Sequence, residues 1–110
     1  RFFLEDRDGC QFVKEAKTKP VFTMLHLGAF PAIIQGGTTA ITGEIFDVNE
    51  DVLKDLDRLE GHPSFYRRTA ITLEDNEVVE TYILQQREKY EDAKVIKSGN
   101  WIRGEKKDGK

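Results

Sequence analysis

Glu60 is an acidic residue at a position that the surrounding helical pattern predicts to be buried. Residues 49–61 read as one amphipathic helix, with Asn49 as its N-cap and Gly61 as the residue that ends it. At about 100° per residue, Glu60 shares an arc of roughly 120° with four apolar side chains. These are Val52, Leu53, Leu56 and Leu59. A buried carboxylate is costly unless paired or neutralised, so Glu60 is either a structural acid with a hidden partner or a general acid/base.

Other kinds of chemistry lack the residues they need. The chain has no Gly-x-Ser-x-Gly nucleophile motif, and Cys10, its single cysteine, has no obvious base beside it. One cysteine excludes an internal disulfide framework and fits a reducing compartment. His26 and His62 with Cys10 do not make a typical zinc set, and no EF-hand spacing occurs. We expect no metal.

Composition sets the broad class of protein. The 110 residues suffice for one domain with a real core, and 38% apolar and 34% charged content is ordinary for a soluble protein. A net charge of −3 suggests neither a nucleic-acid partner nor an anionic membrane. The longest apolar run, 27–34, is too short to span a bilayer. We expect a cytoplasmic protein. The chain begins at Arg1, without an initiator methionine or a signal peptide, so we interpret its natural N-terminus as missing.

The order of expected elements favours an α+β domain. We expect strands at 11–17, 21–25, 33–34, 38–48, 65–73 and 78–85, the last two forming a hairpin through a polar turn at 74–77. Residues 1–8 read as the tail of a short helix, and 87–94 as a helix or a loop. Strands that follow one another directly argue for an antiparallel or mixed sheet rather than a βαβ repeat.

Two side chains shortly after the helix are candidates to approach Glu60. Tyr66 and Arg67 follow it by a short loop, so they can fold back near the helix end. Tyr66 could bond the Glu60 carboxylate or a ligand, and Arg67 could bind a carboxylate. The alternative is that Tyr66 packs in the core while Arg67 and Arg68 are surface charges.

Four motifs together carry a family resemblance. They are Gly-Ala-Phe-Pro-Ala at 28–32, Gly-Glu-Ile-Phe-Asp-Val at 43–48, Leu-Asp-Arg-Leu-Glu-Gly at 56–61 and Phe-Tyr-Arg-Arg at 65–68. Their order and spacing resemble those of the gamma-glutamylcyclotransferase-like family, in particular its gamma-glutamylamine cyclotransferase and avirulence-induced-gene-like branch. The resemblance covers a domain at residues 1–103 and leaves 104–110 as a polar tail. It implies a small mixed β-barrel with helices packed around it and a cavity at one end.

The resemblance also implies an activity and a set of site residues. Glu60 matches the family's catalytic glutamate, Tyr66 and Tyr82 match tyrosines that approach the substrate, and Phe30 and Pro31 match the cavity-lining stretch. The implied reaction converts a gamma-glutamyl compound into 5-oxoproline and a free amine or amino acid. The implied partner is therefore a small gamma-glutamyl molecule, and the implied reaction needs neither a metal nor an organic cofactor.

One departure from the family pattern keeps two alternatives open. The family's first strand ends in a Tyr-Gly-Ser/Thr-Leu loop that binds the substrate carboxylate, and these 110 residues contain no such sequence. Residues 1–4 look like the segment that follows the loop, so the N-terminal strand of the barrel is expected to be missing. The first alternative is a non-catalytic module that binds a small metabolite on the same fold. The second is an interaction protein whose incomplete barrel pairs with another chain.

Overall fold

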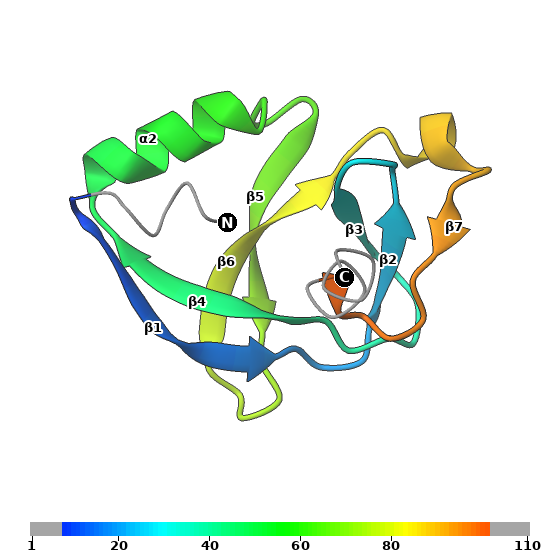
Figure 1. Ribbon diagram of the computed structural model, residues 1–110, viewed down its shortest axis with the longest axis horizontal. Coiled ribbons are helices and arrows are strands. Elements are labelled where there is room, and N and C mark those ends of the chain that lie inside the picture. Colours follow the sequence, from blue (N-terminus) through cyan, green and yellow to red (C-terminus); the bar gives the residue numbers. More distant parts are fainter. Residues whose placement is uncertain (1–7, 102–110) are drawn as a thin grey trace, which may run out of the picture.

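The computed structural model describes residues 8–101, in which strands outnumber helices (Figure 1). In chain order the elements are β1 (Cys10–Lys17), β2 (Phe22–His26), β3 (Pro31–Gln35), β4 (Thr42–Val48), α2 (Glu50–Leu59), β5 (Tyr66–Thr72), β6 (Val78–Leu84), a 3-10 helix (Arg87–Tyr90) and β7 (Lys94–Val95). The α+β class predicted from the sequence is confirmed. The expected helix tail at 1–8 and the tail at 104–110 lie at or beyond the ends of this range.

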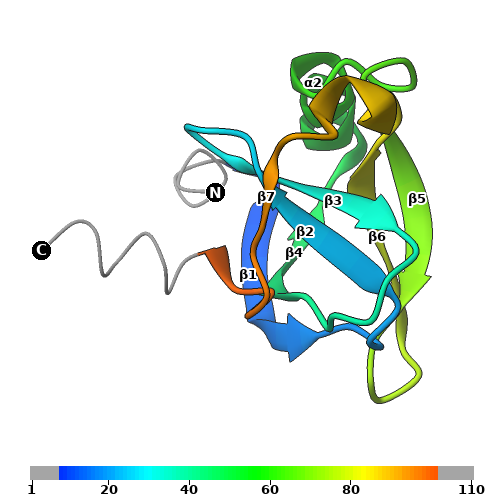
Figure 2. The ribbon, with the colours of Figure 1, turned by 90° about the vertical axis from the view of Figure 1, so that its right-hand side faces the viewer.

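The strands form three antiparallel sheets within the described range. One pairs β1 with β4, a second places β2 between β3 and β7, and the third is the β5–β6 hairpin. Figures 1 and 2 show the three sheets arranged around a common interior. Hydrogen bonding between the described strands does not run continuously around that interior, so a closed barrel stays a prediction.

Helix α2 lies across one end of the molecule, opposite the turn of the β5–β6 hairpin (Figure 1). The side chain of Asn49 accepts a hydrogen bond from the Val52 amide at 2.9 Å, so the predicted N-cap is confirmed. Val52 and Leu56 are buried and pack against a small group of side chains from the strands. The group comprises Cys10, Phe46, Val48 and Tyr82. Leu59 is 60% exposed, so the prediction that it faces the core is wrong: the buried face of the helix is narrower than its apolar arc.

The C-terminal end of α2 is fixed by its backbone. Gly61, with a φ of +68°, donates its N–H to the carbonyl of Arg58 at 3.2 Å, and His62 donates to the carbonyl of Asp57 at 2.9 Å. These two bonds are those of a Schellman motif, which requires a left-handed residue after the helix. Glu60 is the helix C-cap, so its position is set by this turn.

Two apolar clusters fill the space between the sheets. The first contains Phe22, Met24, Ile41, Ile71 and Ile83, and the second Leu25, Ala32, Ile34, Tyr66 and Leu84. No helix in residues 8–101 is both long and apolar enough to cross a membrane.

Candidate active site

Glu60 is one of the few buried charged residues of the described chain, with a relative exposure of 6%. Its burial is what the helical pattern predicted. The amide of Glu60 donates to the Leu56 carbonyl at 2.9 Å, and its carbonyl accepts from the Tyr66 amide at 3.3 Å. The backbone of this residue is therefore held on one side by the last turn of α2 and on the other by the first residue of β5.

One helical turn before Glu60, Asp57 joins α2 to the β5–β6 hairpin. Its Oδ1 accepts from Arg68 Nε at 3.0 Å and from the Tyr82 hydroxyl at 2.6 Å, and its Oδ2 accepts from an Arg68 Nη atom at 3.1 Å. The guanidinium thus binds the carboxylate with two parallel hydrogen bonds. Arg68 also donates to Glu80 at 3.0 Å. We call Asp57, Arg68 and Tyr82 the clamp.

The clamp perturbs the acidity of its members. Burial on its own would raise the pKa of Asp57, but the hydrogen bonds from Arg68 and Tyr82 and the charge of Arg68 lower it. Hydrogen bonds to Asp57 and then to Glu80 raise the pKa of Arg68. Burial, the hydrogen bond to Asp57 and the Asp57 charge raise the pKa of Tyr82, and the charge of Glu60 adds to this rise. Asp57 is therefore ionised and Tyr82 is neutral near pH 7, and the Glu60 carboxylate lies within electrostatic reach of the phenol.

Both histidines of the chain act as hydrogen-bond acceptors. His62 Nδ1 accepts from the Arg68 amide at 3.0 Å, which ties the loop after α2 to strand β5. His26 Nδ1 accepts from the Gly28 amide at 3.0 Å in the β2–β3 turn. In residues 8–101, no three His, Cys, Asp or Glu side chains gather as a possible metal site.

The structure brings three of the predicted site residues together and leaves two apart. The three are Glu60, Tyr66 and Tyr82. Tyr66 is buried in the second apolar cluster, and Tyr82 packs against that cluster. Tyr82 also packs against Val52 and Leu56 of α2, within electrostatic reach of Glu60. Phe30 is 45% exposed in the turn between β2 and β3. Pro31 begins β3 and lines a cavity elsewhere in the interior.

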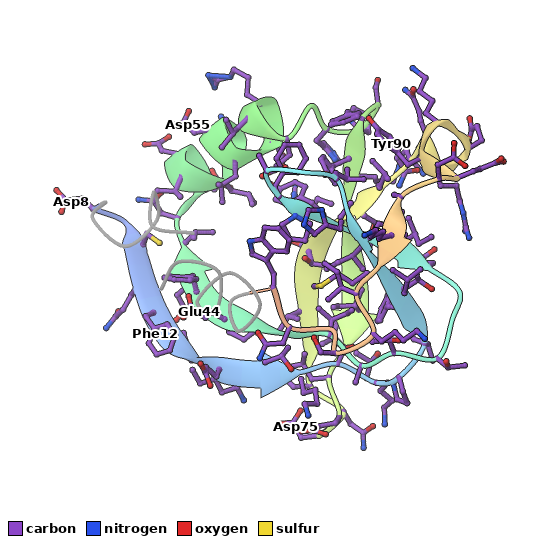
Figure 3. The ribbon with its side chains drawn as sticks, turned by 45° about the vertical axis from the view of Figure 1, so that its right-hand side comes forward. Asp8, Phe12, Glu44, Asp55, Asp75 and Tyr90 are labelled. Atoms are coloured by element: carbon purple, nitrogen blue, oxygen red, sulfur yellow. The ribbon has the colours of Figure 1, made fainter. Side chains whose placement is uncertain are left out.

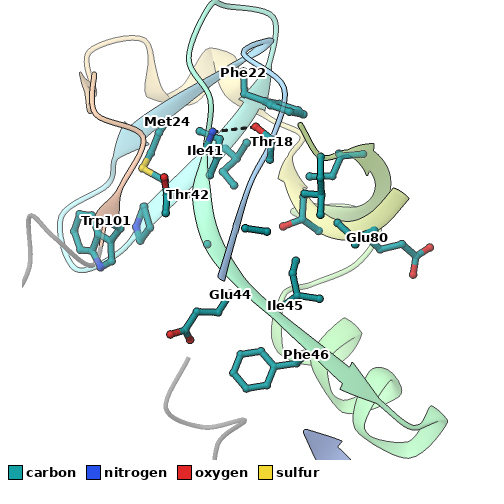
Figure 4. Close-up of a pocket in the computed structure, with 18 residues that line it drawn as sticks. Thr18, Phe22, Met24, Ile41, Thr42, Glu44, Ile45, Phe46, Glu80 and Trp101 are labelled. Carbon is teal, nitrogen blue, oxygen red and sulfur yellow. Dashed lines mark hydrogen bonds between the residues drawn. The ribbon is translucent and has the colours of Figure 1, made fainter. Parts of the chain in front are cut away.

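That cavity, of about 280 Å³, lies among strands β1 to β6 (Figure 4). Its wall is mainly apolar, with Thr18, Thr42 and Thr81 as neutral polar members. Glu44 and Glu80 belong to the lining, but both carboxylates extend away from its centre (Figure 4). Its described lining contains no lysine, arginine or histidine, and neither Glu60, Tyr66, Tyr82 nor Phe30. Glu60 therefore does not line this cavity, although Glu80, which accepts a hydrogen bond from Arg68, does.

Sequence reasoning missed the clamp. Arg68 was interpreted as a surface charge, but its side chain is only 25% exposed and its partner Asp57 21%. The available signal was strand alternation: Arg68 lies two residues after the buried Tyr66, and therefore on the same face of β5. Asp57 gave no comparable signal, because on the helical wheel it falls outside the apolar arc. Arg67 is exposed, which confirms its interpretation as a surface charge.

Known proteins of the same kind were found by sequence and by structure. Residues 3–103 match the family described as "Gamma-glutamyl cyclotransferase, AIG2-like". A Methanocaldococcus jannaschii protein named "Putative gamma-glutamylcyclotransferase" is 33% identical over 76 residues, which are 66% of this chain and 62% of that protein. A Vibrio cholerae protein of the same name is 32% identical over 91 residues, covering 83% and 76% of the two chains. The crystal structure of a uropathogenic E. coli-specific protein matches with a TM-score of 0.74 at 22% identity, covering 88% of this chain and 77% of that one.

The chain therefore belongs to the AIG2-like gamma-glutamylcyclotransferase family, as its motifs indicated. The structural match shows a shared fold and, at 22% identity, no more than that. The match to the archaeal relative spans less than two thirds of that protein's length.

Proposed function

We propose that this protein is a gamma-glutamylcyclotransferase in which Glu60 moves the proton. The observation that carries the proposal is the burial of Glu60 at the fixed C-terminal end of α2, in a member of this family. A carboxylate in such a place retains a fixed geometry relative to the strands beside it. A general acid/base needs that fixed geometry, because it must lie within hydrogen-bond reach of the proton that it moves.

The proposed reaction is an intramolecular acyl transfer. The α-amine of a gamma-glutamyl compound lies within five-membered-ring distance of its own γ-carbonyl carbon, but it is protonated and unreactive at neutral pH. Glu60 takes a proton from the ammonium, and the freed amine attacks the carbonyl carbon to form the ring. The attacking nitrogen then loses a second proton, so that the ring nitrogen ends as a neutral lactam N–H. Glu60 passes one proton to the leaving nitrogen as the old carbon–nitrogen bond breaks, and the other goes to the released amine, which leaves as an ammonium, so Glu60 is again a carboxylate. The products are 5-oxoproline and a free amine or amino acid.

Tyr66 and Tyr82 are proposed to border the substrate, as the family pattern assigns. Tyr82 is the better supported of the two, because its hydroxyl lies within the electrostatic reach of Glu60. The family assigns the substrate carboxylate to a Tyr-Gly-Ser/Thr-Leu loop, which has no counterpart in these 110 residues. The activity should therefore be sought in the intact gene product, together with any residues encoded upstream of Arg1.

The test is the identification of products from a small panel of gamma-glutamyl amines, gamma-glutamyl amino acids and glutathione. We expect 5-oxoproline from at least one of them, with an equimolar amount of the leaving amine. The Glu60→Gln variant should release none above background. Glu50→Gln is a matched control, because Glu50 is an exposed acid in the first turn of the same helix. Hydrolysis to glutamate instead of cyclisation would contradict the proposal.

The cavity supports a second candidate function. Its volume of about 280 Å³ and its apolar wall suit a small ligand, and it is separate from Glu60. A non-catalytic module would bind a small, largely apolar metabolite there without releasing 5-oxoproline, and Glu60→Gln would leave that affinity unchanged.

A further inference from the structure

In the clamp, the hydroxyl hydrogen of Tyr82 points at the carboxylate of Asp57. Arg68 and Tyr82 stand directly opposite each other in the β5–β6 hairpin, so their side chains lie on the same face. Both reach the same carboxylate on α2, that of Asp57. Two elements distant in sequence therefore meet at one acid, one helical turn before Glu60.

The Tyr82 hydroxyl is the donor in its bond to Asp57. An ionised carboxylate can only accept, and the bidentate contact with Arg68 keeps Asp57 ionised. At 2.6 Å the bond is in the short range expected for a hydroxyl donating to a charged oxygen. The single hydroxyl hydrogen of Tyr82 is thus committed to Asp57, and the phenol oxygen retains only acceptor capacity.

We propose that Asp57 is a positioning residue that makes Tyr82 a hydrogen-bond acceptor for the α-ammonium of a gamma-glutamyl substrate beside Glu60. This inference rests on the proposed function. When the hydroxyl of a phenol can rotate, its hydrogen can point at a nearby cation, and the partial positive charge of that hydrogen repels the cation. A phenol whose hydrogen is held by Asp57 presents a lone pair instead. Tyr82 and Glu60 would then both favour an ammonium group at one place and hold it before proton transfer.

The inference predicts discrimination between two ligands that differ by the ammonium alone. Gamma-glutamyl ethylamide carries the α-ammonium, and glutaric acid monoethylamide lacks it. Calorimetric binding would be measured in the Glu60→Gln background, so that no turnover interferes. We expect gamma-glutamyl ethylamide to bind at least about tenfold more tightly, since hydrogen bonds to charged groups are worth roughly that factor or more.

Two further substitutions in that background test the role of the clamp. Tyr82→Phe removes the acceptor and leaves the Asp57–Arg68 pair in place. Asp57→Asn keeps the shape but replaces the charged acceptor by a neutral amide. The amide oxygen accepts more weakly than a carboxylate and the amide NH2 can donate to the phenol, so the hold on the phenol hydrogen is weakened. Both should reduce the preference to about threefold or less, and the double variant should lose no more than either single one. Asp51→Asn, at an exposed acid on the same helix, should retain the full preference.

The outcomes separate the inference from the proposed function. If folded Tyr82→Phe and Asp57→Asn retain the full preference for the ammonium ligand, the clamp is purely structural and the inference is overturned. If the folded, intact protein binds neither ligand, the proposed function fails, and the inference fails with it. Should Asp57→Asn not fold, Tyr82→Phe alone decides, because it leaves the ion pair intact.

Discussion

The two ends of the β5–β6 hairpin are both tied to another element by charged side chains, but in different ways. At the α2 end, the clamp joins Asp57 to Arg68 and Tyr82 in a half-buried setting. At the turn end, Lys14 of β1 contacts Glu77 at 2.7 Å and Asp75 at 3.6 Å. Asp75 lies at the tip of the hairpin, far from the helix (Figure 3).

The difference lies in burial and in geometry, not in the number of charges. The Lys14, Asp75 and Glu77 side chains are 41%, 57% and 47% exposed, so water screens them and each retains other partners. Asp57 instead holds a planar guanidinium with two bonds and a phenol with a third. Removing Asp57 would leave the half-buried Arg68 and Tyr82 side chains without their hydrogen-bond partner. An exposed lysine that loses its partner is instead hydrated by solvent. We therefore expect the α2 end to be much the more sensitive.

The largest effect is expected for Asp57→Ala. Loss of the carboxylate leaves Arg68 and the Tyr82 hydroxyl half-buried without their partner, and should reduce the free energy of unfolding by about 2 kcal/mol. Urea unfolding followed by circular dichroism measures it. Asp51→Ala on the same helix should change that free energy by no more than about 0.5 kcal/mol. Equal losses in the two variants would show that the clamp has no special role.

Acid should remove the contribution of Asp57 gradually. Its pKa is lower in the folded protein than its ordinary value of 3.8, so its stabilising effect is present above that value. The effect is lost as the pH falls through the folded-state pKa. The difference in unfolding free energy between the parent protein and Asp57→Asn should therefore be constant near neutral pH and shrink below pH 3.8. A difference that stays constant down to pH 2 would contradict this assignment.

A smaller effect is expected for Gly61→Ala at the turn that holds Glu60. A Cβ at Gly61 would sit 3.1 Å from the Phe65 Cβ, and the φ of +68° is unfavourable for alanine. We expect a loss of about 1 kcal/mol in unfolding free energy. Gly43→Ala is the control, because a Cβ there meets no atom within 4 Å, and thermal unfolding should show little change. If Gly61→Ala were as stable as Gly43→Ala, the turn at Gly61 would tolerate a Cβ without strain, which would contradict this prediction.

The smallest effect is expected for Lys14→Gln at the exposed end. Its ion pairs are solvated, so the urea midpoint should stay within experimental error. Adding salt should likewise leave the parent and the variant indistinguishable. A loss as large as that for Gly61→Ala would show that the two ends of the hairpin are more alike than their burial indicates.

Local patterns predicted the elements around the site better than the contacts within it. The helix, its Asn49 cap and its Gly61 stop follow from rules that involve only a few neighbouring residues, and all three are confirmed. The hairpin followed from two alternating runs separated by a polar turn. The burial of Glu60 followed from the helical period, whereas Leu59, on the same arc, is exposed because the helix packs through a narrower face.

Long-range pairing could not be predicted in the same way. Asp57 and Tyr82 are 25 residues apart, and their contact depends on how α2 crosses the hairpin. A helical wheel places Asp57 outside the apolar arc without showing that a strand carries its partners. The same limit applies to the cavity, whose wall is assembled from six strands and Trp101.

The most direct test of the central claim compares turnover and binding in Glu60→Gln. Replacing the proton carrier by an amide of the same shape should reduce kcat for 5-oxoproline release by about 10²- to 10⁴-fold. The dissociation constant for gamma-glutamyl ethylamide should change much less than kcat. A Glu60→Gln protein whose kcat stays within a few-fold of the parent value would contradict the assignment of Glu60 as the acid/base.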